Sequence, residues 1–432
     1  MRRSNLKMAL FAAFLASAAM LGTAEARPAG SAVVWVGSWA SSQQIPEPRN
    51  ALDPEDLHDA TLRQIVHLSI GGRELRVRLS NAFGTGPLHV TAVHVAKPLS
   101  RSSGSIDSST DRVLTFCGVP DATIPAGADY ISDPIAYPVA ALSDLAVSIY
   151  LETPPEQQTS HPGSRATSFF VHGNHTVDVD LLNAKQVDHW FQISGIDVAA
   201  VPRAAAVVTL GDSITDGRGS TTNGNDRWPD NLARRFQASL ATRSLGVLNV
   251  GTGGNRLLLD QLGPNALSRF DRDVLAQTGV RTLIVYEGIN DLGNLTSEHD
   301  VTAAEHDALV RHMIAAYEQI ILRARAHAIK VLGATITPDV GFELYHATPV
   351  NEADRQAVNA WIRAPGHFDA VVDFDKLVRD PASPDRLLPA YDSGDHIHPS
   401  AAAYRAMADA IPLAFFAQKS SHHVKRIKLK RR

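Results

Sequence analysis

Two different hydrophobic patterns meet near Pro202. After this residue, short apolar runs alternate with longer segments whose apolar residues recur at helical spacing. The runs expected to be strands are 204–210, 246–250, 281–287, 329–336 and 370–374, and the helical segments are 227–241, 303–326, 351–362 and 401–416. Strands that alternate with helices form a mainly parallel sheet covered by helices. The sequence therefore predicts an α/β fold over 203–417, with three α/β/α layers and a five-stranded sheet.

Before Pro202, apolar and polar residues alternate with a period of two. This pattern predicts strands at 61–70, 74–80, 88–95 and 145–151, separated by turns rich in glycine, proline and serine. Gly71-Gly72 lies between the first two strands and predicts a hairpin. Short strands with one polar face favour a β-sandwich, jelly-roll-like, over 31–200.

The start of the chain has the pattern of a secretory signal peptide. Residues 1–7 are basic, 8–22 are apolar, and Ala24-Glu25-Ala26 supplies the small residues of a cleavage site after Ala26. We therefore expect a secreted or periplasmic protein with no transmembrane segment after cleavage; an uncleaved anchor is less favoured because the apolar run is short. Cys117 is the only cysteine, which excludes an intramolecular disulfide and is compatible with a bacterial envelope or medium.

The opposite end of the chain is basic. The basic residues of 419–432 are Lys419, Lys425, Arg426, Lys428, Lys430, Arg431 and Arg432, and no acidic residue accompanies them. A solvated, disordered tail over 418–432 is the simplest interpretation. The alternative is that the tail attaches the protein to an anionic envelope surface. The main body, with 20% charged and 44% hydrophobic residues, gives no sign of nucleic-acid binding.

Candidate chemistry appears where the first predicted strand ends. The run 207–217 is an apolar strand followed by a tight turn, and it places Ser213 at the carboxyl end of the strand, where open α/β sheets carry their sites. A serine hydroxyl needs a base to become a nucleophile. His398 is a candidate base, and Asp395, three residues earlier, is a candidate for orienting its imidazole.

Other residues compete for each of these roles. Asp392 is a second candidate acid and His396 a second candidate base, and the chemistry alone leaves the choice open. Gly253-Gly254 follows the second strand, and Asn290-Asp291 follows the third; taken singly, such pairs are usually a loop and a helix cap.

In chain order, four segments resemble the sequence blocks of the SGNH (GDSL-type) serine hydrolase superfamily. These are Gly211-Asp212-Ser213, 249–256, 283–291 and Asp395-x-x-His398, with Ile214 where the family's nickname has leucine. The resemblance covers about 204–417, and Trp35-Val36-Gly37-Ser38-Trp39 and 80–84 resemble a region that precedes the catalytic domain in a secreted bacterial subset. It implies the SGNH-type α/β/α fold, a catalytic triad and an oxyanion hole. The triad it implies is Ser213, Asp395 and His398, and the oxyanion donors are the backbone N–H groups of Ser213 and Gly254 and the side-chain amide of Asn290.

The resemblance implies a secreted serine esterase that hydrolyses carboxylic esters through an acyl-enzyme and needs no cofactor. The expected location and the β-rich region favour deacetylation of a carbohydrate, so the expected partner is an acylated polysaccharide. A lysophospholipase or arylesterase acting on lipid or aryl esters, an acyltransferase and, in a different class, a non-catalytic carbohydrate-binding protein are the alternatives. Two roles are open for the aromatic residues Trp35, Trp39 and Phe83. They would either bind sugar or be buried in the core or at the interface between the domains. The histidine pairs at 396/398 and 172/175 lack a convincing third ligand, so no metal is expected.

Overall fold

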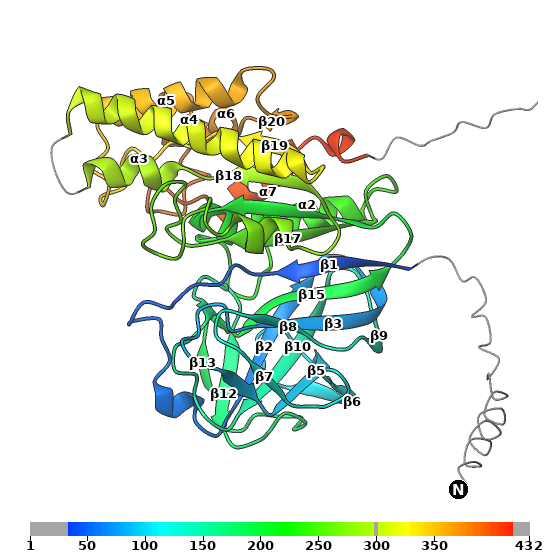
Figure 1. The fold of residues 1–432 in the computed structure, drawn as a ribbon. Helices are drawn as coiled ribbons and strands as arrows, with labels where there is room; N and C mark the ends of the chain where they lie inside the picture. Colours follow the sequence, from blue (N-terminus) through cyan, green and yellow to red (C-terminus); the bar gives the residue numbers. More distant parts are fainter. Residues whose placement is uncertain (1–32, 298–300, 418–432) are drawn as a thin grey trace, which may run out of the picture.

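The computed structural model describes residues 33–297 and 301–417 (Figure 1). We call residues 33–200 the β region and residues 204–417 the α/β region. The predicted signal peptide at 1–26 and the basic tail at 418–432 lie outside the described residues.

The β region is built from two large antiparallel sheets. One has the order β1-β15-β3-β8, with β9 also paired to β3, and the other has the order β13-β12-β2-β10-β5-β6. The strands of the first are β1 (Val34–Ala40), β15 (Ile193–Ala200), β3 (Gly72–Ser80), β8 (Asp129–Ile131) and β9 (Ile135–Val139). Those of the second are β13 (Lys185–Val187), β12 (Ser168–His172), β2 (Ala60–Leu68), β10 (Ser143–Leu151), β5 (Ala92–Pro98) and β6 (Ile106–Val113). Inward residues of both sheets belong to one hydrophobic cluster, as expected for sheets that pack face to face.

The predicted hairpin at Gly71-Gly72 is wrong. Strand β2 pairs with β12 and β10, whereas β3 pairs with β15, β8 and β9, so the two glycines carry the chain from one sheet to the other. A Cβ on Gly71 would lie 2.6 Å from the carbonyl oxygen of Val139, and one on Gly72 would lie 2.7 Å from Cβ of Val198. The glycines are therefore explained by close backbone approach at the crossing, which has the same sequence signature as a tight turn.

The α/β region confirms the predicted parallel sheet. Its order is β17-β16-β18-β19-β20, and every pairing is parallel. The strands are β16 (Ala205–Gly211), β17 (Leu245–Gly251), β18 (Val280–Tyr286), β19 (Lys330–Ala334) and β20 (Ala370–Val372). All residues of the interior strand β16 are buried, which explains why its sequence is a largely apolar run and does not alternate.

Helices connect these strands and pack in groups. Helix α2 packs on β17 and α7, whereas α4 packs on α5 and β19. The helices are α1 (Ser213–Asp216), α2 (Trp228–Gln237), α3 (Ile289–Thr296), α4 (Ala303–Ala326), α5 (Pro349–Arg363), α6 (Phe374–Val378) and α7 (Ala401–Ala410). The expected helix 401–416 is too long: it ends at Ala410, because the residue before Pro412 is disfavoured in helical conformation. Across the described ranges, we find no helix with the length and apolar character needed to cross a membrane.

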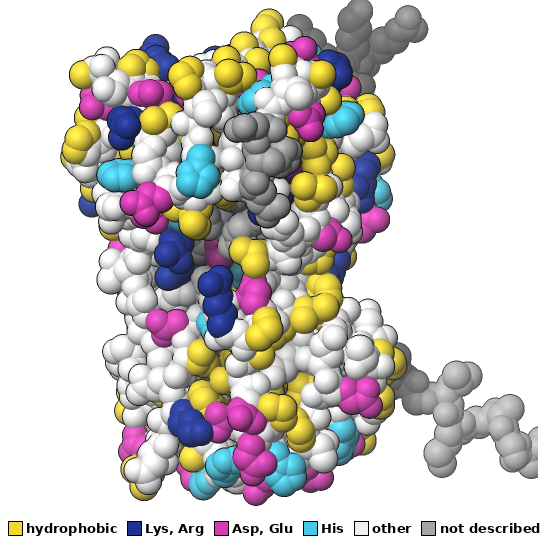
Figure 2. All heavy atoms as spheres, turned by 90° about the vertical axis from the view of Figure 1, so that its left-hand side faces the viewer, with side chains coloured by type: hydrophobic (Ala, Val, Ile, Leu, Met, Phe, Trp, Pro, Cys, Tyr) yellow, Lys and Arg dark blue, Asp and Glu magenta, His cyan; other side chains and the backbone are white. Residues whose placement is uncertain are grey.

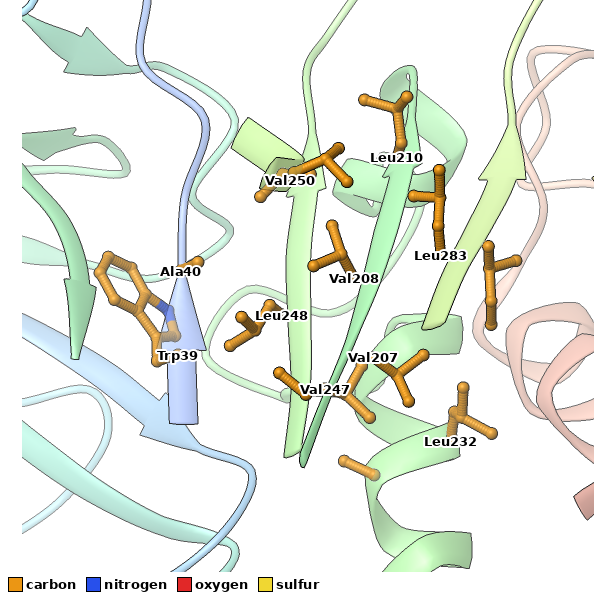
Figure 3. Close-up of a cluster of buried hydrophobic side chains, with 14 of the residues drawn as sticks. Trp39, Ala40, Val207, Val208, Leu210, Leu232, Val247, Leu248, Val250 and Leu283 are labelled. Atoms are coloured by element: carbon orange, nitrogen blue, oxygen red, sulfur yellow. The ribbon is translucent and has the colours of Figure 1, made fainter. Parts of the chain in front are cut away.

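The two regions share one hydrophobic core. Strand β1 lies along β17, and Figure 3 shows Trp39 and Ala40 beside Leu248. A Cβ added to Gly37 of β1 would lie 2.7 Å from Cδ1 of Leu248, so only a glycine allows this approach. The backbone N–H of Gly37 also donates to the carbonyl oxygen of Thr278, at 2.9 Å. The β region is thereby held directly against the sheet that carries the candidate site.

Candidate active site

Ser213 lies where β16 ends and α1 begins. The Asp212 carboxylate caps α1 by accepting the backbone N–H of Ile214 at 2.8 Å, and α1 ends after one turn at Gly217, whose φ is +108°. A Cβ on Gly211 would lie 2.2 Å from Oγ1 of Thr215, so this strand-to-helix turn requires glycine. Because Ser213 is the first helical residue, its backbone N–H has no intrahelical acceptor and is available to a ligand.

The structure brings Ser213 and His398 together across 185 positions of the sequence. Oγ of Ser213 lies 2.8 Å from Nε2 of His398, and Nδ1 of His398 lies 2.7 Å from Oδ2 of Asp395. An ionised carboxylate can only accept, so Nδ1 carries a proton and Nε2 of the neutral ring accepts from the serine hydroxyl. Ser213 and His398 are both buried, and the ring of Phe342 meets the imidazole edge-on at 6.3 Å. This is the geometry of a serine activated by a base that a carboxylate orients.

Asp395 is held ionised by its own segment. Partial burial acts to raise its pKa, but hydrogen bonds from the His398 side chain and from the backbone N–H groups of His398 and Ile397 outweigh it and bring the pKa well below its usual range. Arg218 is a weaker neighbour, since its Nε lies 3.9 Å from Oδ2 of Asp395 and its side chain is exposed.

The competing acid and base form a separate pair. Nδ1 of His396 contacts Oδ2 of Asp392 at 2.7 Å, and the His396 side chain is exposed. The structure thus places Asp395 and His398, and not this second pair, beside Ser213. Pro399 precedes Ser400, the N-cap of α7, and forms a β-bridge with Asp392.

The three residues predicted to supply the oxyanion donors, Ser213, Gly254 and Asn290, line one cleft. Gly254 has φ +70°, a conformation that favours glycine, and a Cβ there would lie 2.5 Å from Cδ1 of Leu262. Asn290 belongs to the first turn of α3, and its Nδ2 donates to the carbonyl oxygen of Asn255 at 2.8 Å. A side-chain amide has two N–H bonds, so one remains for a negatively charged oxygen.

Tyr345 fixes the orientation of that amide, a role that the sequence patterns did not indicate. Its hydroxyl donates to Oδ1 of Asn290, while Nδ2 of Asn290 donates to Asn255. Rotating the amide by 180° would break both hydrogen bonds, so the N–H stays where an oxyanion would need it.

Asp291 and Arg269 hold the loops around the site. The Asp291 carboxylate accepts the backbone N–H groups of Leu257 and Leu258 at 2.8 and 3.1 Å. The fully buried Arg269 donates to the carbonyl oxygens of Val250 and Gly211, at 2.6 and 3.0 Å, and so links the ends of β17 and β16. The sequence did not indicate this role for Arg269, because a single arginine does not alter the hydrophobic pattern of the residues around it.

Buried carboxyls lie beneath the nucleophile. Burial raises the pKa of Asp212 to about 7 and that of Asp291 to about 6, and it raises the pKa of Glu287 well above its usual range. In Asp212 and Glu287, the neighbouring acids add to the effect of burial, whereas Arg269 opposes it. The ionised form of each group is therefore costly in the folded protein.

The site opens into a cleft of about 630 Å³ between the two regions. Figure 2 shows the surface hollowed between the two halves of the molecule, with Lys and Arg side chains beside the hollow. The α/β region contributes the residues above together with Leu262, Phe342 and Leu344. The β region contributes Gln44, Glu47, Arg49, Asn50, His161, Pro162, Gly163, Arg165, Asp188 and His189. None of these β-region residues was predicted from the sequence, since they lie on loops or, for His161, on the two-residue strand β11 (Ser160–His161), and their contacts are with another part of the chain.

His161 is a buried side chain of this wall. Its Nε2 lies 2.9 Å from Oδ1 of Asp216 at the end of α1, its Nδ1 lies 2.8 Å from the carbonyl oxygen of Ser42, and its ring stacks on Trp190 at 5.6 Å. The two ring nitrogens of His161 therefore face oxygen atoms from both regions, Ser42 in the β region and Asp216 in the α/β region. Through His161, the β region is hydrogen-bonded to α1, the helix that begins at Ser213.

The aromatic residues of the β region have structural partners. Trp39 is buried and meets Trp190 edge-on at 4.9 Å, and the guanidinium of Arg272 lies 5.0 Å from the ring centre of Phe83. Arg76 covers Trp35 in the same way, at 4.7 Å. These contacts favour the core and interface interpretation over sugar binding.

The second histidine pair, His172 and His175, also has protein partners. Nδ1 of His172 contacts the carbonyl oxygen of His58, and Nδ1 of His175 contacts Asp178. Within 33–297 and 301–417, no group of three or more His, Cys, Asp or Glu side chains is arranged to hold a metal ion.

A hydroxyl, an imidazole and a carboxylate in sequence, at the carboxyl ends of a parallel sheet, define a serine hydrolase type of site. Residues 209–406 match the GDSL-like Lipase/Acylhydrolase family. A comparison with curated proteins gives no significant match.

Solved structures that match part of this chain include a GDSL-like lipase from Bacteroides thetaiotaomicron, which is 20% identical with a TM-score of 0.36; the match covers 50% of this chain and 90% of that protein. A catalytic mutant of an acetylxylan esterase from Geobacillus stearothermophilus is also 20% identical, with a TM-score of 0.35, and covers 48% of this chain and 91% of its own.

Proposed function

We propose that this protein is a serine esterase that works through an acyl-enzyme. The observation that carries the proposal is the unbroken chain from Oγ of Ser213 through the His398 imidazole to Asp395, with distances of 2.8 and 2.7 Å. Ser213 attacks the ester carbonyl while its proton passes to Nε2 of His398. The imidazolium then protonates the leaving alkoxide, and the freed imidazole activates the water that releases the acid.

The negative charge of the tetrahedral intermediate would be met by three N–H groups. These are the backbone groups of Ser213 and Gly254 and the remaining N–H of the Asn290 amide. Because Tyr345 and Asn255 fix the amide before substrate arrives, little reorganisation is needed as the charge develops.

For the substrate, we propose a short acyl ester of a carbohydrate. Support comes from the two unlike faces of the cleft: Leu262, Phe342 and Leu344 provide apolar surface for a small acyl group, whereas the β-region wall is rich in amide, imidazole, carboxylate and guanidinium groups suited to hydroxyls. We also propose export from the cell, on the basis of the signal pattern at 1–26.

Replacing Ser213 by alanine tests the reaction. Turnover of p-nitrophenyl acetate should fall by several orders of magnitude, with the far-UV circular dichroism and melting temperature unchanged. If the variant keeps substantial activity, Ser213 is not the nucleophile.

A series of p-nitrophenyl esters from acetyl to palmitoyl, followed by acetylated xylan and pectin, tests the substrate. We expect kcat/KM to fall as the acyl chain lengthens and acetate to be released from the polysaccharides. A rise with chain length would instead support the lipid-ester alternative.

A further inference from the structure

Arg165 is held in an unusual conformation on the wall of the catalytic cleft. Its φ is +48°, in the left-handed region that favours glycine and, to a lesser degree, asparagine. Its carbonyl oxygen accepts the backbone N–H of Asn223 at 2.9 Å. On the two sides of it, Arg227 donates to the carbonyl oxygen of Ser164, and Oδ1 of Asn223 accepts the backbone N–H of Thr167 at 2.8 Å. Hydrogen bonds from the α/β region therefore hold the backbone of this β-region residue in its left-handed conformation.

This backbone presents the Arg165 side chain to the same cleft as Ser213. Among the described residues, its buried Nε has no hydrogen-bond partner. The acidic side chains of the cleft are engaged elsewhere: Asp216 with His161, Asp188 with Thr167, Glu47 with Asn50, and Asp395 with His398. The guanidinium thus faces the cleft with none of these acids as its counterion.

We propose that Arg165 binds a carboxylate of the substrate, so that the preferred substrate is an acyl ester of an acidic carbohydrate, such as an acetylated uronic acid polymer. The inference rests on the proposed esterase function and adds the charge of its substrate. A guanidinium pairs with a carboxylate through two parallel N–H bonds, which gives both energy and orientation. Arg49 and Arg218 line the same cleft with exposed side chains and add positive charge at its mouth.

The geometry also assigns the direction of binding. The acyl group must lie at Ser213, Gly254 and Asn290, on the α/β side, so the alcohol portion of the ester extends toward the β-region wall where Arg165 lies. A carboxylate on the sugar, and not on the acyl group, is the group that this arginine would select.

The test compares two forms of one substrate. Acetylated oligogalacturonates with free carboxylates and the same oligomers with carboxyls converted to primary amides are hydrolysed under identical conditions, and released acetate is measured. We expect the wild-type kcat/KM to be about tenfold or more higher for the free acid, as a charge-assisted hydrogen bond predicts. Arg165→Asn and Arg165→Gly both accept a positive φ and should reduce this ratio to near one. Arg405→Gln, which changes an exposed arginine on α7, should leave the ratio unchanged.

Equal wild-type rates on the two forms, or a preference that survives in both Arg165 variants, would overturn the proposal. If wild type cleaves p-nitrophenyl acetate but neither oligomer, the esterase function stands and the acidic-carbohydrate proposal fails. If wild type cleaves none of the three, the proposed function itself fails.

Discussion

The buried carboxyl of Asp212 should make the stability of the protein depend on pH. In the folded protein its pKa is raised from 3.8 to about 7, first by burial and then by neighbouring acids. In the unfolded chain it returns to its ordinary value. Between these two pH values the folded protein binds a proton that the unfolded chain has lost, so raising the pH across this window lowers the free energy of unfolding.

The size of the effect follows from the shift. Each pKa unit corresponds to about 1.4 kcal/mol, so a rise from 3.8 to about 7 predicts a loss of about 4 kcal/mol between pH 4 and pH 7. Asp212→Asn removes the titrating group but keeps an oxygen that accepts the Ile214 N–H, so the cap of α1 is retained. The variant should match wild type near pH 4 and be more stable by up to about 4 kcal/mol above pH 7.

Urea unfolding followed by tryptophan fluorescence at pH 4, 5, 6, 7 and 8 measures this difference directly. Asp409→Asn, at an exposed carboxylate on α7, serves as the matched control and should stay within about 0.5 kcal/mol of wild type throughout. A wild-type-minus-Asp212→Asn difference that does not change between pH 4 and pH 8 would refute the reasoning, because it would mean that the carboxyl does not titrate in this window.

Four further outcomes are expected. Tyr345→Phe should lower kcat for p-nitrophenyl acetate about threefold to tenfold with little change in KM, whereas Asn290→Ala should lower kcat about 100- to 1000-fold. Equal losses in the two variants would contradict the view that Tyr345 acts only by positioning the Asn290 amide. Asp395→Asn should lower kcat by several orders of magnitude across pH 5 to 9, and a rate that recovers at high pH would argue against an orienting role. His161→Ala should lower the free energy of unfolding in urea by about 3 kcal/mol, because it leaves a buried carboxyl unpaired; an unchanged midpoint would show that the pair adds nothing. Deleting 419–432 should reduce salt-sensitive adsorption to anionic vesicles if the tail binds envelope surfaces, and unchanged adsorption would remove that idea.

The α/β region could be predicted from sequence because its signals are local. A strand buried on both faces is an apolar run, as in β16, and a turn that must present a serine beside backbone needs glycines on both sides of it. The pairing of Asp395 with His398 also has a local signature, a three-residue spacing within one turn. These features depend on neighbours in the sequence, so the pattern and the structure agree.

The parts that could not be predicted depend on contacts between distant segments. Gly71-Gly72 has the same signature whether the chain turns back on itself or crosses to another sheet, and only the packing of β3 on β15 decides between them. His161 ends the two-residue strand β11, Arg165 lies in the loop that follows, and their roles arise where these residues meet α1 and the Asn223 loop. Periodicity carries no information about such contacts, because a two-residue strand and a loop are too short to show a repeating pattern.

The close contact between Gly37 of β1 and Leu248 of β17 predicts how the α/β region would behave if it were produced without the β region. A fragment that starts at residue 203 would keep Ser213, His398 and Asp395. It would expose to water the apolar side chains of β17 that β1 covers, and it would lose the hydrogen bond from His161 to Asp216 of α1. Such a fragment is expected to self-associate and to have low esterase activity. Replacing the β region by that of another enzyme would likewise change one wall of the catalytic cleft.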